Sequence, residues 1–551
     1  TFDKRLKAAY DDAMKGGLWK GKYASVNHHE YFAEGVQSWF DNNREPDHDH
    51  NHVNTRAELL EYDAGLAAMC KEVFGDTELR YTKPVTRLSG HLAGYDPSKA
   101  PSFAWPERLA AAKAEIRKQA EARSAGNSKP AETGETRAQA TGPVRTEIVS
   151  PIRNASFNKG GKAKNRKQGG NARTVGGNLV FDGTDDGNRQ VDPQIAVGGG
   201  FVVHATNLGL VIFDKKGNYV DGVPQSEFNG GIDPKLFFDV HNRSFIFDLW
   251  NPWDEAKLKP VNISVSETDD PKGAWNTYPV PAPNGVDGGG IGYSRKWVGY
   301  SFPGGTERTF VMKTAELKSG KPSTAYHFAG NLGQPVFTQD ATDDLMFVQL
   351  TGQEIVLTLV GEGQSGTPVI KSVIRAPHNF RSFGSPPQSP MKGTEAKTAS
   401  GDRNPKNLVV QGEHLWFSHA VNIDGRAAVQ WHQVRLDGGF VQSGLISDEK
   451  NSYIQTSIAV NKRKDVLVGF QETGPDMFIS GRCAWRKVGD QAGKLGPIFS
   501  IAEGLAATEG GSWGDYSGST VDGDNLTDLW TVQSVANSAG RGSTVITRIK
   551  M

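Results

Sequence analysis

The sequence predicts a multidomain protein with a small all-α N-terminal domain and an all-β region that folds as a propeller. Three observations lead to this prediction: the length of 551 residues, the helical spacing of apolar residues near the start, and the many short β-rich runs that follow. Single cores stop growing at roughly 250–300 residues, so the chain divides into domains. We expect a helical domain at 1–123, a flexible linker at 124–177 and the propeller at 178–551.

The first domain is predicted from amphipathic patterns. Apolar residues recur at steps of three or four from Phe2 to Tyr10, which is the spacing of one helix face. A second helix is expected from about Asn27 to Phe40. Thr55 and Glu58 have the spacing of a capping box, in which the two side chains satisfy each other's backbone amides. A third helix is therefore expected to begin there.

The composition changes after Ser124. Up to about Gly177 the chain is rich in Ala, Gly, Asn, Lys, Thr and Pro. Such a segment cannot bury enough apolar area to offset the entropy lost on ordering. The segment is therefore predicted to be a linker, with room for one strand near 145–152.

The remaining residues alternate short runs rich in β-branched and aromatic residues with turn clusters, and glycine is abundant at 65 residues. Asp192, Asp233 and Asp270 each precede a proline and recur about 40 residues apart, near the period of a four-stranded blade. At about 50 residues per blade this region predicts about seven blades, with six as the alternative.

Charge and cysteine content exclude several classes of protein. Lys plus Arg and Asp plus Glu both number 62, so no net charge attracts nucleic acid, and we predict no nucleic-acid partner. No stretch approaches the ~20 apolar residues of a membrane helix, so we predict no membrane span. Cys70 and Cys483 lie in different predicted domains, which excludes a disulfide framework and leaves an odd pairing or two free thiols.

The second predicted helix carries the sharpest chemical pattern. Glu30 and Glu34 lie one turn apart, so both carboxylates leave one helix face, either to hold a metal or as a solvated acidic stripe. With Tyr23 and Asn27 they match the pattern Tyr, Asn, Glu-(Phe/Tyr)-Phe-Ala-Glu. This segment resembles the downstream zinc-site helix of the anthrax-lethal-factor-like peptidases, and the resemblance covers roughly residues 1–85.

The resemblance implies that Glu30 is a zinc ligand, that the Tyr23 hydroxyl stabilises the oxyanion, and that Glu34 and Asn27 orient the site without binding the metal. Catalytic zinc takes three protein ligands and a water. The His-Glu-x-x-His motif that would supply two histidines and the general base is absent from this sequence. We expect that motif upstream of Thr1; an inactive domain is the alternative.

Three further groups are interpreted as surface structure. The alternating histidines of 47–52 share a face if extended, but without apolar neighbours they are predicted to form a solvated loop. The pair His28–His29 is interpreted as exposed first-turn residues. Asp522, Asp524 and Asp528 leave calcium open as a cofactor, although a plain Asp/Gly turn fits their spacing better.

The region from about Val191 to the C-terminus resembles secreted bacterial propellers of the sialidase-like type. Thr268–Trp275 resembles a degenerate Asp-box turn, which is structural, and Asp515-Tyr516 is interpreted as a strand-closing contact. The resemblance implies a secreted or cell-surface location. No sialidase site is recognisable in the sequence.

Two functions remain open. In the first, the protein is a zinc metallopeptidase whose propeller binds a protein or peptide substrate, or an extracellular matrix or surface component. In the second, it is a non-catalytic propeller for binding or surface assembly. The absent histidine motif leaves enzymatic activity uncertain.

Overall fold

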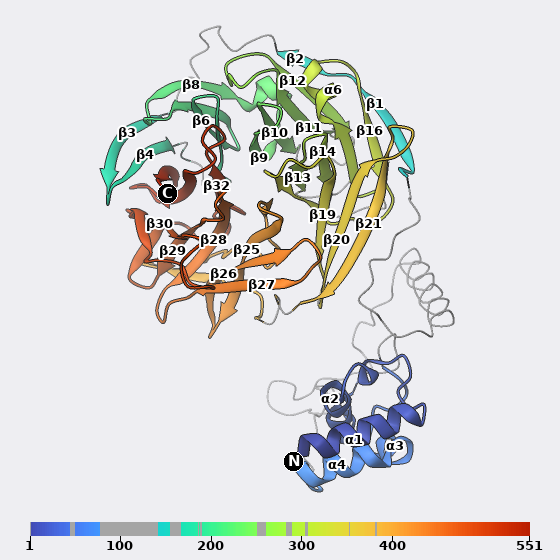
Figure 1. Ribbon diagram of the computed structural model, residues 1–551. Helices are drawn as coiled ribbons and strands as arrows, with labels where there is room; N and C mark the ends of the chain where they lie inside the picture. The colour runs from blue at the N-terminus through green and yellow to red at the C-terminus, as the bar shows by residue number, and fades with distance from the viewer. Residues whose placement is uncertain are drawn as a thin grey trace, which may run out of the picture. The chain divides into compact units, whose positions relative to one another are not determined.

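The structure is a computed structural model of the chain (Figure 1). It describes residues 2–43, 50–77, 142–154, 167–185, 187, 190–250, 260–282, 289–302, 307–351, 353–378, 380 and 383–551.

The chain forms two compact units, Thr1–Glu132 and Thr133–Met551. The first is helical and the second is built from β-sheets, which confirms the predicted fold class. The predicted domain boundary at residue 123 stays a prediction. In the part of the chain that is described, no helix is long and apolar enough to cross a membrane.

The helical unit begins its helices where the sequence places caps. The Asn27 side chain accepts from the amides of His29 and Glu30 at the start of the second helix, and Thr55 and Glu58 form the predicted capping box. The elements are α1 (Phe2–Lys15), η1 (Tyr23–Ser25), α2 (His28–Trp39), α3 (Arg56–Tyr62) and α4 (Ala64–Phe74).

One buried carboxylate holds this unit together. Asp63, between α3 and α4, accepts from the Trp19 indole at 2.8 Å and the Tyr31 hydroxyl at 2.7 Å. Its other oxygen accepts from the Leu66 amide at 2.9 Å and so caps α4. Charge-assisted hydrogen bonds of this kind are stronger than neutral ones. Asp63 therefore fixes the core aromatic side chains relative to α4.

The second unit consists of groups of antiparallel strands that are mainly consecutive in the chain. A short strand, Phe337–Thr338, joins two of these groups into one ten-stranded sheet through parallel pairs. The first four groups, from inner to outer strand, are β5 (Gln194–Gly198), β6 (Phe201–Thr206), β7 (Gly209–Asp214), β8 (Tyr219–Pro224); β9 (Ile232–Asp239), β10 (Ser244–Trp250), β11 (Pro260–Ser266), β12 (Trp275–Pro281); β13 (Gly290–Tyr293), β14 (Trp297–Ser301), β15 (Thr309–Lys313), β16 (Ser323–Phe328); and β17 (Gln334–Pro335), β19 (Leu345–Leu350), β20 (Glu354–Glu362), β21 (Pro368–Pro377).

The next groups are β24 (Leu408–Val410), β25 (His414–Ile423), β26 (Arg426–Arg435), β27 (Phe440–Ile446); β28 (Ser452–Val460), β29 (Val466–Gly474), β30 (Met477–Arg486), β31 (Phe499–Ala502); and β32 (Gly518–Val521), β33 (Leu529–Ala536), β34 (Gly542–Ile549), β4 (Asn178–Asp185). Between them lie η5 (Gln225–Phe228), α6 (Thr314–Ser319), β18 (Phe337–Thr338), and the hairpin of β22 (Ser389–Met391) and β23 (Thr394–Thr398). The described strands thus form seven groups, and the blade number of the complete ring stays a prediction.

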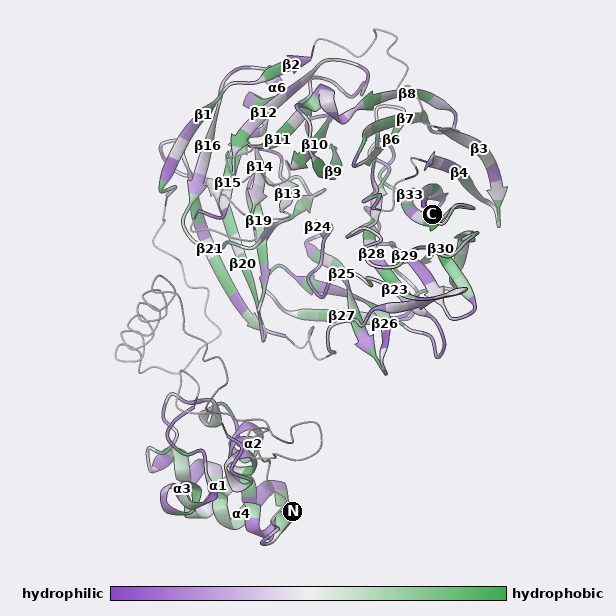
Figure 2. Cartoon of the chain, turned by 180° about the vertical axis from the view of Figure 1, so that it is seen from behind, coloured by the Kyte–Doolittle hydropathy of each residue, from purple (hydrophilic) through white to green (hydrophobic). Residues whose placement is uncertain are grey.

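The innermost strands form a closed ring. Contacts run from β5 to β9 and β13, from β13 through β18 to β24, and then to β28, β32 and back to β5, and β17 contacts β13. The blades surround this ring, as a propeller requires (Figure 1). Hydrophobic stretches follow the strands, where neighbouring blades pack together (Figure 2).

The last group closes the ring with a strand from its beginning. β4 pairs with β34, so that Phe181 lies opposite Ile546. Both side chains are fully buried, and they pack with Trp530 and Phe213 between the first and last blades. Closure therefore joins both ends of the unit in one core.

The strand expected near 145–152 is present at Arg145–Val149, and the linker prediction missed the strands at Ile152–Asn154 and Lys167–Val175. β1 (Arg145–Val149) pairs with β16, β2 (Ile152–Asn154) with β12, and β3 (Lys167–Val175) with β4. An outer edge strand is held mainly through backbone hydrogen bonds, so it forms without an apolar composition.

Both cysteines are free and buried. Cys70 lies in the helical core, where burial raises the pKa of its thiol to about 12. Cys483 lies on β30, where burial also raises the pKa of its thiol. Of the two readings left open, two free thiols is correct, and neither is a reactive thiolate at neutral pH.

Replacing Phe181 by Ala removes the central side chain of the closing pair. We expect the propeller to lose about 3–5 kcal/mol of unfolding free energy, because a buried ring is replaced by a cavity. Urea unfolding followed by near-UV circular dichroism measures the loss. The control is Phe440→Ala, since Phe440 is 56% exposed on β27 and should change stability by about 0.5 kcal/mol or less. Equal effects of both variants would contradict the assigned role of β4.

Candidate functional site

The loops that enter β5, β9 and β32 meet at one end of the ring of inner strands. The Asp192 carboxylate accepts from the Asp515 amide at 2.6 Å and from the Asn207 side chain at 2.7 Å. The Asn207 oxygen in turn accepts from the Asp233 amide at 2.7 Å. One hydrogen-bond network therefore connects the entries to three blades.

The Asp-Pro repeat seen in the sequence is part of this network. Asp192 lies two residues before β5 and Asp233 is the second residue of β9, with left-handed φ angles of 47° and 56° that aspartate tolerates better than most residues. Asp270 lies instead in the turn before the outer strand β12. There the Trp275 indole donates to the Pro271 carbonyl at 2.9 Å, as expected for a turn closed by an aromatic residue. Only the first two Asp-Pro pairs occupy equivalent blade positions.

Beside the network lies a cavity of about 430 Å³, which we call the axial pocket. Its polar lining contains side chains that donate hydrogen bonds, side chains that accept them, and side chains that can do either. The lining residues are Asp233, Lys235, Gly289, Gly290, Ser301, Phe302, Asn331, Gly333, Gln334, Val348, Gln349, Leu350, Asp402, Asn404, Pro405, Lys406, Leu408, Asp515 and Tyr516.

Lys235 is the most unusual residue of the axial pocket. It is only 4% exposed, and its Nζ has no hydrogen-bond partner within the described residues. The ammonium lies over the ring of Tyr516. Burial lowers the pKa of Lys235, and the charge of nearby Lys406 lowers it further.

The charge of Lys235 faces several buried carboxylates. Asp248, opposite on β10, accepts from the Lys235 amide at 2.7 Å, and burial raises the pKa of Asp248. Asp192 and Asp233 also favour the charged form of Lys235. Burial raises the pKa of Asp192 as well. A group of perturbed pKa values beside a cavity is typical of functional sites, although structural networks produce it too.

Tyr516 serves as a wall of the pocket. Its hydroxyl donates to the Pro234 carbonyl at 2.9 Å and is fully enclosed, and burial raises the pKa of the phenol well above its usual value. The geometry agrees with the predicted closing contact of Asp515-Tyr516 rather than with a nucleophile.

The predicted residues of the helical unit lie around the start of α2. Tyr23 is in η1 and is half-buried, Asn27 caps α2, and Glu30 is half-buried in its first turn. Glu34 is buried and contacts the Asn43 amide at 3.0 Å and the His50 imidazole at 3.3 Å. Glu34 therefore belongs to the core of the unit, and whether it orients a metal site stays a prediction.

His50 corrects the reading of the histidine run as a solvated loop. Its side chain is 8% exposed and paired with Glu34. His52 packs edge-on against the ring of Tyr62 and is exposed. His48 lies outside the described residues. The sequence indicates a solvated run because it does not show that His50 pairs with the buried carboxylate of Glu34.

The zinc predicted at Glu30 does not fit the described residues. Three metal-ligating side chains converge at one place within the described ranges, and Glu30 is not among them. One carboxylate does not hold catalytic zinc, which takes three protein ligands. No step of a reaction can therefore be derived through a zinc ion at Glu30.

In the turn that contains Asp522, Asp524 and Asp528, which the sequence leaves open for calcium, protein cations already neutralise carboxylate charge. Lys215 Nζ contacts Asp522 and Asp524 at 2.6 Å each, and Arg243 contacts Asp524 at 2.9 Å. The amides of the glycines at 199 and 200 donate to the same Asp524 carboxylate. The arrangement supports the plain Asp/Gly turn, because protein cations occupy the oxygens that calcium would need.

Sequence reasoning did not single out Lys235, Asn207 or Asp248. A weak signal existed, since Lys235 directly follows the second Asp-Pro pair. Asn207 and Asp248 carry no local signal, because their roles depend on contacts between strands.

No protein-family model matches this chain, and no curated protein matches it. Solved structures similar to its fold include apo AztD from Citrobacter koseri, with 12% identity, a TM-score of 0.28, and coverage of 56% of this chain and 72% of that one. Another is a PL25 ulvan lyase bound to -[GlcA(1-4)Rha3S]-, with 10% identity, a TM-score of 0.31, and coverage of 74% of this chain and 95% of that one. A third is an α-L-arabinofuranosidase from Fusarium graminearum, with 7% identity, a TM-score of 0.29, and coverage of 74% of this chain and 98% of that one. These similarities are too low to indicate a function.

The Asp524 contacts predict a pH dependence of stability. Burial opposes ionisation, but Lys215, the Gly200 amide and Arg243 outweigh it and lower the pKa of Asp524 to about 2. A lowered carboxyl pKa stabilises the fold above the unfolded value of 3.8, and this gain is lost as the pH falls toward 2.

Asp524→Asn should therefore cost about 1 kcal/mol at pH 7, allowing for solvent screening at this part-exposed site. The difference from the unmodified protein should shrink between pH 4 and pH 2, measured by urea unfolding at each pH. A difference that stays constant over this range would show that the charge of Asp524 contributes nothing.

Proposed function

We propose that this protein is a binding module whose axial pocket binds a saccharide. Sugar hydroxyls both donate and accept hydrogen bonds, so their sites combine both kinds of partner. In the axial pocket Asp402 and Asp515 accept, Lys235 and Lys406 donate, and Gln349 can do both. The volume of about 430 Å³ falls within the roughly 300–1,000 Å³ of small-molecule sites.

The observation that carries the proposal is the Lys235 ammonium. A buried charge without a hydrogen-bond acceptor is costly, because it has lost water and gained only part of a replacement. A ligand hydroxyl or ring oxygen beside Lys235 would supply the acceptor. The rings of Phe302 and Tyr516 contribute an apolar part of the lining of the same pocket, where sugar C–H groups can make contact.

The proposed ligand belongs to a cell surface or matrix, in keeping with the predicted secreted or surface location. That location stays a prediction. The zinc-peptidase hypothesis also stays a prediction, as do the roles of Tyr23, Asn27, Glu30 and Glu34 in it. It requires two further zinc ligands beside Glu30, and the group of three potential ligands formed by the described residues does not include Glu30.

Binding is tested with an array of neutral and acidic oligosaccharides, followed by calorimetry with the tightest binder. Gln334→Ala/Gln349→Ala removes two lining amides without touching Lys235, and should weaken binding at least about tenfold, since two hydrogen bonds are lost. The control is Gln491→Ala, an exposed glutamine outside the pocket, which should bind normally.

Lys235→Met keeps the volume of the side chain and removes its charge, and should also reduce affinity. Its folding is checked by near-UV circular dichroism, because Lys235 balances buried carboxylates. The proposal fails if no oligosaccharide binds, or if the double glutamine variant binds as tightly as the unmodified chain.

A further inference from the structure

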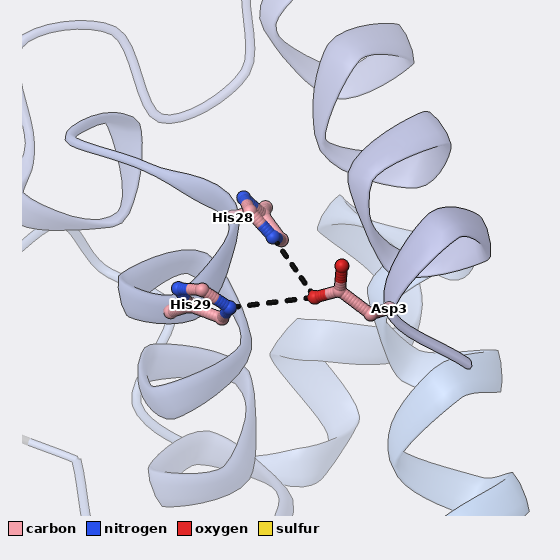
Figure 3. A group of neighbouring side chains, drawn as sticks. All are labelled: Asp3, His28 and His29. Carbon is pink, nitrogen blue, oxygen red and sulfur yellow. Dashed lines mark hydrogen bonds and ion pairs between the residues drawn. The ribbon is translucent and has the colours of Figure 1, made fainter. Parts of the chain in front are cut away.

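Three potential metal ligands from two helices converge in the helical unit. Asp3 is in the first turn of α1, and His28 and His29 are the first two residues of α2. One ligand atom from each lies within 4.8 Å of the others. Figure 3 shows the carboxylate of Asp3 facing both imidazole rings.

The separations match those around a single metal ion. Metal–ligand bonds of about 2.1 Å place neighbouring ligand atoms about 3.0 Å apart at right angles and about 3.4 Å apart in a tetrahedron. Asp3 Oδ1 lies 3.0 Å from His28 Nε2 and 3.3 Å from His29 Nε2. Both values fall in that range, and the ligand atoms of the two imidazoles lie within 4.8 Å of each other.

The backbone positions the two imidazoles in advance. The Asn27 side chain accepts from the amides of His29 and Glu30 and thereby fixes the first turn of α2. The two histidine rings are neighbours, with centroids 4.0 Å apart. The His28 side chain is only 20% exposed, whereas those of His29 and Asp3 are 72% and 64% exposed. Water can therefore complete the coordination on the open side.

We propose that Asp3, His28 and His29 form a site for a divalent transition-metal ion, with zinc as the probe. Two imidazoles and one carboxylate are ligands suited to zinc, cobalt, nickel and copper rather than to calcium or magnesium. The positive ends of the helix dipoles oppose a cation here, and the Asp3 carboxylate offsets that effect. The bound ion joins α1 to α2. This site is independent of the saccharide proposal and excludes Glu30.

Zinc titration of the untagged full-length chain by isothermal calorimetry tests the site. The unmodified protein should bind one zinc at this site and gain thermal stability in its helical unit, because the ligand binds only the folded form. His28→Ala/His29→Ala should remove that binding and that gain. His52→Ala removes an exposed histidine of the neighbouring His-rich run and should retain both.

Two more variants distinguish zinc binding at Asp3, His28 and His29 from zinc binding at Glu30. Glu30→Gln should bind zinc normally, which distinguishes this site from the predicted peptidase ligand. Asp3→Ala keeps both imidazoles and should weaken zinc binding at least tenfold. This variant tests the proposed site even if the double histidine variant does not fold. Unchanged affinity in Asp3→Ala, or in a folded His28→Ala/His29→Ala protein, overturns the proposal.

Discussion

The pairing of β4 with β34 is the contact on which the propeller depends. It joins the beginning of the β-unit to its last strand and removes two sheet edges at once. The core around Phe181 and Ile546 is the seam between the first and last blades. Without it the two ends of the ring would be joined mainly by the contacts of β5 with β32 and by hydrogen bonds such as that from the Asp515 amide to Asp192.

Closure also builds the axial pocket. Asp192 follows β4 in the chain, whereas Asp515 precedes β32, more than 300 residues later. Their hydrogen bond exists only because the ends of the ring meet. Asn207 extends the connection to Asp233, which lies in β9, the strand that carries Lys235. The position of the buried ammonium is therefore a consequence of how the ring closes. Burying such a network costs desolvation energy, which its hydrogen bonds offset.

The sequence predicts those features that depend on neighbouring residues. The caps at Asn27 and Thr55 mark the helix starts, and the turn-rich pattern indicates the propeller. It does not predict strands such as β3, because an edge strand held by backbone hydrogen bonds leaves little trace in composition. It also misses the burial of His50 and Lys235, since both depend on carboxylates that are distant along the chain or on another strand. Long-range electrostatics, rather than local propensity, determines the candidate site.

The central claim is that ring closure places Lys235 in a pocket that receives a sugar. A crystal structure of the full chain with a bound oligosaccharide tests it most directly. The account predicts a sugar oxygen within hydrogen-bond distance of Lys235 Nζ, with the ring against Phe302 or Tyr516. Sugar density at another face of the propeller, with the axial pocket holding water alone, would contradict it.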